Sequence, residues 1–229
     1  MRNLLCLLAI LCLPFVSVSS AQQGQRTDVN IVIAIDCSWS INRFEYMLQM
    51  EGIAAALRDP DVRTAIQQGR HGRIGLMMTQ WSHLNSQVVS IPWQEVQTDD
   101  QLESFASLVE RMPRKPVEGG TSISAALDHA QLALDSAPFA GDRHVINLVS
   151  DGENNSGERV EHARDRAILR GTTINVAAVV GEFHWLHHYM RNRVMGGEGA
   201  FVIEVADYND LVNGFKKKLI REIRGDALI

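Results

Sequence analysis

Short apolar runs alternate with longer amphipathic stretches along most of this chain. The run from Val29 to Ile35 is rich in β-branched residues and apolar at nearly every position, which is typical of a strand buried on both faces within a parallel sheet. Similar runs recur in the second half of the chain, each followed by a stretch with helical periodicity. This alternation predicts an α/β fold: a doubly wound, mostly parallel sheet with helices on both faces.

The individual elements can be placed from periodicity and from turn residues. Asn85 and Ser86 separate two adjacent runs, which predicts a hairpin and one antiparallel strand at the sheet edge. Asn42 to Arg58 reads as a helix capped by Ser40 or Asn42, with Phe44, Met47, Leu48, Ile53 and Leu57 toward the core. The expected strands are 29–35, 73–81, 87–93, 143–150, 173–180 and 200–205, and the expected helices are 42–58, 62–68, 99–112, 122–136, 158–170, 185–194 and 208–224.

Oxygen-bearing side chains stand where two of these strands end. Asp36-Cys37-Ser38-Trp39-Ser40 follows the first strand, and Asp151 follows the strand that ends at Ser150. Thr121 comes after the glycine turn Gly119-Gly120. In a doubly wound sheet, ligands bind beyond the carboxyl ends of the strands where the winding reverses, so these side chains should meet there. Two carboxylates with neutral hydroxyls suit six-coordinate Mg²⁺ or Mn²⁺, whereas Ca²⁺ fits less well because it usually takes more carboxylates.

Asp-x-Ser-x-Ser, a later Thr and a later Asp-Gly, in this order, resemble the metal-ion-dependent adhesion site of von Willebrand factor A domains, over residues 28–224. Within that superfamily the chain is most similar to an uncharacterised bacterial group of exported single-domain members. The shared motifs are 71–74, 80–82, 119–121, 151–157 and 196–202.

The resemblance implies a divalent metal held by Asp36, Ser38, Ser40, Thr121 and Asp151. Ser38 and Ser40 would be direct ligands, and the other three would share direct and water-bridged roles. It also implies a partner protein that contributes an Asp or Glu to the metal. Trp39, Glu153, Asn154 and Asn155 are then candidate partner contacts.

Other interpretations of these residues remain open. Ser40 could simply cap a helix, and Asp151-Gly152 could form a turn. A metal held by paired carboxylates could activate water in a hydrolase, or the metal could be purely structural. The sequence contains no Gly-x-Ser-x-Gly elbow, no His-Glu-x-x-His and no phosphate-binding glycine loop, so we expect a binding module and not an enzyme.

The N-terminal residues predict export. Arg2, the apolar stretch 4–16 and the small residues Ser19-Ser20-Ala21 have the layout of a signal peptide over residues 1–21, which indicates a periplasmic or secreted protein with no membrane span in the mature chain. Two of the three cysteines fall in this segment, which leaves Cys37, expected to be a small buried hydrophobe and not a reactive thiol.

Charge and the remaining motifs add little. A net charge of −5 argues against nucleic-acid binding. His184, His187 and His188 lie at helical spacing but lack a local acidic or thiol ligand, so a solvated helix surface is the favoured interpretation, and Lys216-Lys217-Lys218 reads as a solvated helix end.

Overall fold

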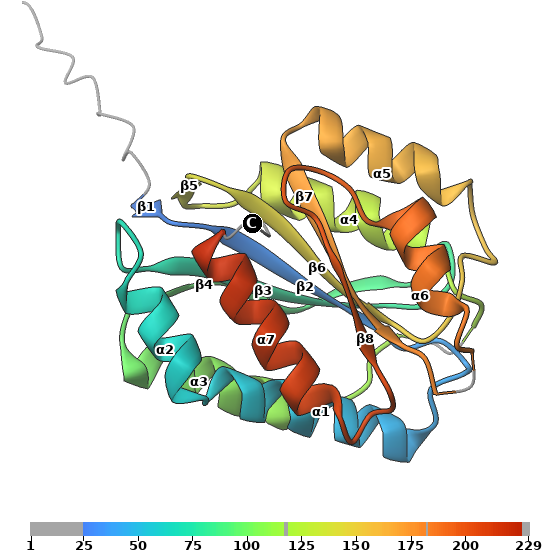
Figure 1. Ribbon diagram of the computed structural model, residues 1–229, viewed down its shortest axis with the longest axis horizontal. Helices are drawn as coiled ribbons and strands as arrows, with labels where there is room; N and C mark the ends of the chain where they lie inside the picture. Colours follow the sequence, from blue (N-terminus) through green and yellow to red (C-terminus); the bar gives the residue numbers. More distant parts are fainter. Residues whose placement is uncertain (1–24, 117–118, 182, 226–229) are drawn as a thin grey trace, which may run out of the picture.

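The apolar runs form a six-stranded sheet in the computed structural model, which describes residues 25–116, 119–181 and 183–225 (Figure 1). The strand order is β4-β3-β2-β6-β7-β8, and every neighbouring pair is parallel except β3 and β4. The strands are β2 Asn30–Asp36, β3 Ile74–Trp81, β4 Gln87–Val96, β6 His144–Ser150, β7 Thr172–Val179 and β8 Val202–Val205. The predicted doubly wound sheet with one antiparallel edge strand is therefore confirmed.

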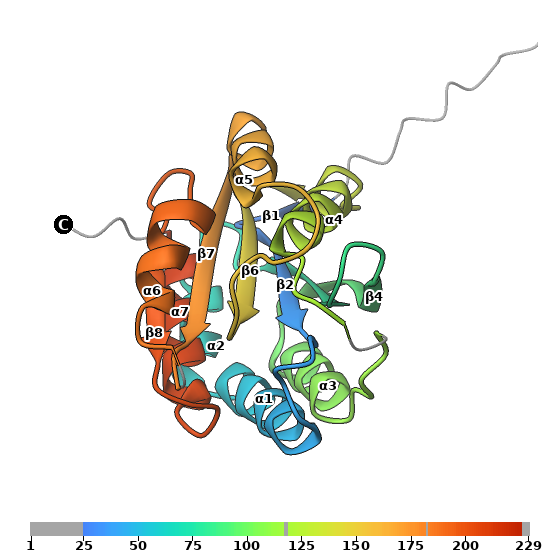
Figure 2. The same ribbon diagram turned by 90° about the vertical axis from the view of Figure 1, so that its right-hand side faces the viewer.

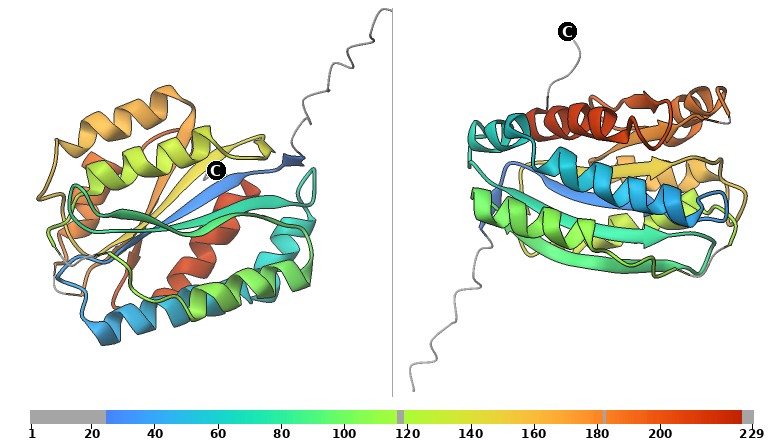
Figure 3. Two further views of the ribbon diagram at one scale, coloured as in Figure 1. Left: turned by 180° about the vertical axis from the view of Figure 1, so that it is seen from behind. Right: turned by 90° about the horizontal axis from the view of Figure 1, so that it is seen from below.

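Helices cover both faces of the sheet, as Figure 2 and Figure 3 show. Alternate residues of β2 point to opposite sides: Ile31, Ile33 and Ile35 join one apolar cluster, and Val32 and Ala34 join the other. The first cluster lies under α1 Arg43–Leu57, α2 Pro60–Gln67, α3 Asp99–Glu110 and α7 Leu211–Arg224. The second lies under α4 Ile123–Asp135, α5 Val160–Leu169, α6 Leu186–Tyr189 and the π-helical turn Met190–Val194.

A second, two-stranded sheet joins β1 Arg26–Thr27 to β5 Ala140–Gly141 in parallel. No sequence pattern predicts this sheet, because each strand is only two residues long. The predicted signal peptide, residues 1–21, lies outside the described residues. Within those that are described, no helix is both long and apolar enough to cross a membrane.

The inward face of α1 differs from the prediction at its N-terminal end. Asn42 is the N-cap, in a capping box with Glu45, and Ile53 and Leu57 are buried as expected. Phe44 and Met47, however, are 60% and 45% exposed, so their assignment to the core was wrong. Apolar residues lie on all sides of this helix, so periodicity alone does not select the face that Tyr46 and Met50 occupy.

The lysine run in α7 also differs from its prediction as a solvated helix end. Lys218 is fully buried, and its Nζ lies 2.6 Å from Glu222 Oε1. Both residues lie on the same buried face of α7 as Leu211, Phe215 and Leu219. Asn147 and Asn175 donate to the Glu222 carboxylate at 2.6 and 3.1 Å, so a buried charge pair and its hydrogen bonds join α7 to β6 and β7.

Candidate metal site

The residues predicted to hold a metal come together at the carboxyl ends of the neighbouring strands β2 and β6. Figure 2 looks onto these strand ends. The chain runs from β2 toward β3 and β4 on one side, and from β6 toward β7 and β8 on the other, so this is the point where the winding reverses. Asp36 is the last residue of β2, and Asp151 directly follows β6. The topology therefore places both carboxylates at the carboxyl end of the sheet.

Asp36 is fully buried and held by the strand next to it. Its Oδ1 accepts a hydrogen bond from the Ser38 backbone N at 2.8 Å, and its Oδ2 accepts one from Ser150 Oγ at 2.6 Å. Burial, and secondly the neighbouring charge of Asp151, raise the pKa of Asp36 to about 7. The carboxylate is thus fixed in position and costly to keep charged unless a positive charge lies nearby.

The two serines bridge the carboxylates. Ser38 Oγ lies 3.1 Å from Ser40 Oγ, which in turn donates to Asp151 Oδ1 at 2.7 Å. Tyr208, which the sequence interpretation missed, lies 3.3 Å from Asp151 Oδ2 through its hydroxyl. Burial raises the pKa of Asp151 and, still further, the pKa of Tyr208, so the tyrosine stays protonated and donates.

Thr121 reaches the same place from the loop before α4. Its Oγ1 is 3.4 Å from the position that a Cβ on Gly152 would take, which sets its hydroxyl against the residue after Asp151. Asn155 holds this loop, because its Oδ1 accepts from the Thr121 backbone N at 2.8 Å. A Cβ on Gly120 would lie 2.8 Å from that oxygen, so the glycine turn leaves room for the contact.

The predicted partner contacts have different surroundings. Trp39 is 74% exposed and Glu153 is also exposed, so both can be reached from solvent. The side-chain oxygens of Asn154 and Asn155, by contrast, accept hydrogen bonds from the backbone amides of Ser124 and Thr121. Their evident role is to position the Thr121 loop.

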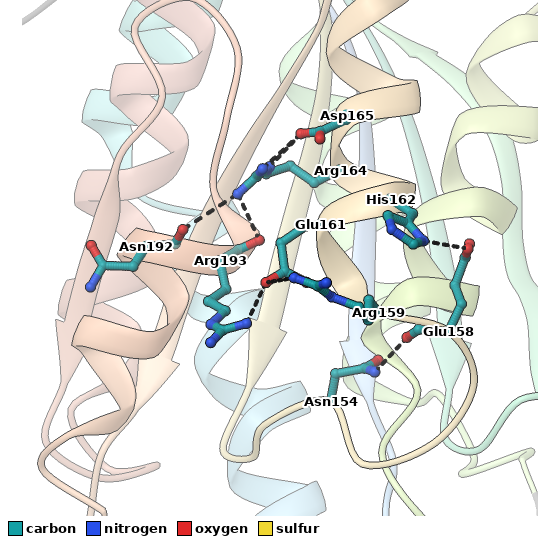
Figure 4. A network of polar contacts seen from close by, with 9 residues as sticks. All are labelled: Asn154, Glu158, Arg159, Glu161, His162, Arg164, Asp165, Asn192 and Arg193. Carbon is teal, nitrogen blue, oxygen red and sulfur yellow. Dashed lines mark hydrogen bonds and ion pairs between the residues drawn. The ribbon is translucent and has the colours of Figure 1, made fainter.

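The loop after Asp151 is tied down further along by the polar network in Figure 4. Asn154 Nδ2 donates to the carbonyl of Glu158, just before α5. Within α5, Glu161 pairs with Arg193, and Arg164 donates to the Arg193 carbonyl at 3.1 Å. These contacts join the π-helical turn to α5 and the loop to the residues just before that helix.

Arg114 is a second residue that the sequence interpretation missed. Its guanidinium donates to the carbonyl oxygens of Cys37, Ser38 and Ile41 at 2.6, 2.9 and 3.0 Å. It therefore holds the backbone of the loop that carries both serines. An arginine in a proline-flanked loop carries no sequence signal for such a role.

Cys37 and the three neighbouring histidines have different surroundings. Cys37 is a free, buried thiol, as predicted, and burial raises its pKa. His187 lies 3.5 Å from Glu204, while His184 and His188 are exposed. No group of three or more His, Cys, Asp or Glu side chains able to hold a metal occurs in the part of the chain that the structure describes.

The donor set fits a hard divalent cation. The Ser40 hydroxyl lies within hydrogen-bonding distance of both the Ser38 hydroxyl and an Asp151 carboxylate oxygen, with Asp36 and Thr121 beside them. Such oxygens are the ligands that Mg²⁺ and Mn²⁺ prefer. A cavity of about 80 Å³ opens beside Asp151 and is lined by Ser40, Glu45, Phe183, Asp207 and Tyr208 among others.

Comparisons with known proteins agree with this fold. Residues 26–227 match the family model described as "Protein of unknown function (DUF1194)". No curated protein sequence is significantly similar to the chain.

Three solved structures illustrate the likeness. A von Willebrand factor type A protein from Catenulispora acidiphila is 18% identical (TM-score 0.65; 86% of this chain and 43% of that chain covered). Proximal thread matrix protein 1 from the mussel byssus, solved with a zinc-occupied MIDAS motif, is 16% identical (TM-score 0.62; 88% and 49% covered). An aerotolerance-related membrane protein from Bacteroides fragilis is 18% identical (TM-score 0.56; 86% and 100% covered). The chain spans less than half the length of the first two, and these likenesses establish a von Willebrand factor A fold.

Proposed function

The chain belongs to the DUF1194 family, and from its von Willebrand factor A fold and its gathered oxygen donors we propose that it is a divalent-metal-dependent protein-binding module. The observation that carries the proposal is the set of short contacts from Ser38 Oγ to Ser40 Oγ and on to Asp151 Oδ1, beside the buried Asp36. Asp36, Ser38, Ser40, Thr121 and Asp151 would hold Mg²⁺ or Mn²⁺. When bound, the cation would supply a positive charge that can attract an Asp or Glu side chain of a partner protein.

The chain's own residues prepare this site in two ways. Ser150 and the Ser38 backbone fix the orientation of Asp36, and Tyr208 does the same for Asp151. Arg114 and Asn155 hold the two loops from which Ser38, Ser40 and Thr121 project. Preorganised donors lose little conformational entropy when a ligand binds, which favours binding through a few weak neutral oxygens.

Binding is favoured over metal-dependent hydrolysis by the groups around the carboxylates. Among the described residues, the side chains that hydrogen-bond to Asp36 and Asp151 carry hydroxyl groups, on serines and Tyr208. A hydroxyl is a poor general base near neutral pH. The two other carboxylates that line the cavity beside Asp151 are held by backbone amides: Glu45 accepts from the Asn42 N, and Asp207 accepts from the Asn209 and Asp210 N.

Calorimetric titration with Mg²⁺ and Mn²⁺ tests the metal site. We expect weak binding by the wild-type chain, because neutral hydroxyls make up much of the donor set, and no measurable binding by Asp151→Ala. Asp100→Asn, an exposed carboxylate at the start of α3, should bind as the wild type does. Identical isotherms for wild type and Asp151→Ala would refute the proposed ligand set.

We also propose that the protein is exported to the periplasm or the medium after cleavage near Ala21. The observation is the order of a positive residue, an apolar stretch and small residues over 1–21. Expression of the full chain in a Gram-negative host, followed by intact-mass measurement, should give a product without these residues. A product of full-length mass in the cytoplasm would contradict export.

A further inference from the structure

A groove of about 720 Å³ lies between the first turns of α1 and the C-terminal end of α3. We call it the methionine groove; its apolar lining is Phe44, Met47, Met50, Met112 and Pro113. Phe44 and Met47 are the residues of α1 that the periodicity had assigned to the core and that instead face solvent. The volume is within the range of pockets that take up ligand groups.

The methionine groove adjoins the proposed metal site. Arg114 lines the groove, and the same guanidinium donates to the carbonyls of Cys37 and Ser38 in the metal-ligand loop. The exposed ring of Trp39 belongs to that loop as well. A ligand that touches the metal site and continues along α1 would therefore reach the groove.

The charges at the rim favour an acidic occupant. Arg43 is exposed and forms no ion pair in the part of the chain that the structure describes. Glu110, the carboxylate at the opposite rim, pairs with Arg58 at 2.9 Å, an arginine that it shares with Glu103. The lining of the groove thus carries two arginines, Arg43 and Arg114, against the single carboxylate of Glu110. A divalent cation at the metal site would add positive charge nearby, so a negatively charged segment would be attracted to both.

The apolar lining favours a side chain over a polar ligand. Methionines adapt their shape to varied apolar groups and are common at surfaces that bind peptides. Exposed aromatic residues such as Trp39 and Phe44 are the types that contribute most at protein interfaces. Apolar residues gathered at one exposed groove typically mark a binding surface.

We propose that the methionine groove is the second half of the recognition surface and binds an apolar side chain from an acidic segment of the partner protein. An Asp or Glu of the same segment would occupy the metal site, so this inference rests on the proposed function. Recognition would then require two features a short distance apart in one segment: a carboxylate and a large apolar side chain. Neither half alone would give strong binding.

A random-peptide phage library, selected on the wild-type chain in millimolar Mg²⁺, provides the probe. We expect the selected peptides to combine an Asp or Glu with a large apolar residue at a recurring spacing. The affinity of one synthetic selected peptide is then measured by fluorescence anisotropy. Met47→Lys should weaken binding at least about tenfold, since it puts a charge into the groove while lysine remains compatible with a helix.

Controls separate the groove from the metal site. Leu132→Lys alters an equally apolar and more exposed residue, on α4 at the other face of the sheet, and should leave peptide affinity unchanged. Thr121→Ala and chelator should each abolish peptide binding, whereas Met47→Lys should leave the Mg²⁺ isotherm of the chain as it is. Calorimetry on Met47→Lys therefore shows whether a loss arises in the groove or at the metal.

The other outcomes overturn the inference in distinguishable ways. Peptides that need Mg²⁺ but are insensitive to Met47→Lys would leave the proposed function intact and remove the groove from it. Peptides sensitive to Met47→Lys but indifferent to chelator would separate the groove from the metal site. A library that yields no binders, or a change of oligomeric state in Met47→Lys measured by sedimentation, would also refute the assignment, the latter by pointing to a second copy of the chain as the occupant.

Discussion

Asp36→Asn is expected to lower the affinity for Mg²⁺ at least about 100-fold and yet to leave the chelator-treated protein as stable as the wild type, or more stable. Asp36 is fully buried. Without a cation, its ionised form is destabilised by loss of solvation and by repulsion from Asp151. Asparagine keeps an oxygen to accept from the Ser38 amide, and its amide can donate to Ser150 Oγ. The substitution thus removes the buried charge without breaking the local hydrogen bonds.

Asp28→Asn is the matched control for this prediction. Asp28 is a buried carboxylate just before the other end of β2, where its oxygens accept from the backbone amides of His71 and Arg73 at 2.8 and 3.3 Å. It lies away from the proposed metal site, so its replacement should leave the Mg²⁺ isotherm unchanged and should not stabilise the protein. Denaturant unfolding with and without Mg²⁺ measures both quantities. A large loss of stability in Asp36→Asn under chelator would show that its charge serves the fold itself.

Lys218→Met is expected to lower the free energy of unfolding by about 3 to 5 kcal/mol, because it leaves the Glu222 carboxylate buried without its positive partner. Lys218 and Glu222 are both almost fully inaccessible, and the remaining contacts of the carboxylate are the amides of Asn147 and Asn175. The double variant Lys218→Met/Glu222→Gln should recover much of the loss, since glutamine carries no charge. Its side-chain oxygen can accept from Asn175, and its Nε2 can donate to Asn147 Oδ1 once that amide turns over. Chemical denaturation of the two single variants and the double variant yields the coupling energy.

The pH dependence of the same measurements gives an independent readout. Burial lowers the pKa of Lys218 from 10.5 to about 8. Between these values the unfolded chain binds more protons than the folded one, so the contribution of Lys218 to stability increases as pH rises from about 8 to 10.5. The difference in unfolding free energy between wild type and Lys218→Met should widen over this range. A constant difference would mean that Lys218 titrates normally.

The sequence was sufficient for the architecture because the apolar runs and the turns between them are strongly patterned. Asp36 and Asp151 could be placed at the carboxyl end of the sheet from topology alone, since both stand at the ends of parallel strands where the winding reverses. The linear sequence also shows the motif in its full order: Asp36, Ser38, Ser40, Thr121 and Asp151. That these residues gather at the carboxyl ends of the strands was therefore predictable from the sequence.

The misses have a common physical cause: they depend on contacts between distant parts of the chain. The position of Lys218 in the core depends on an acidic partner four residues later and on two asparagines from other strands, and composition alone favours a solvated lysine. The helical period does indicate that Lys218 could be buried, because Lys218 and Glu222 fall on the apolar face of α7. Arg114 gave no such hint, because its three carbonyl partners lie more than seventy residues earlier.

The small sheet of β1 and β5 has a consequence for how this unit can be connected. It fixes the start of the described chain against residues 140–141, and a Cβ on Gly225 would touch the Arg143 side chain, so the end of α7 lies close by. Both ends of the described chain thus lie on the side of the sheet where the strands begin, opposite the proposed metal site (Figure 1). The unit is accordingly suited to modular use: a tether, a surface linker or a host protein joined at either end would leave the proposed metal site pointing away from the junction.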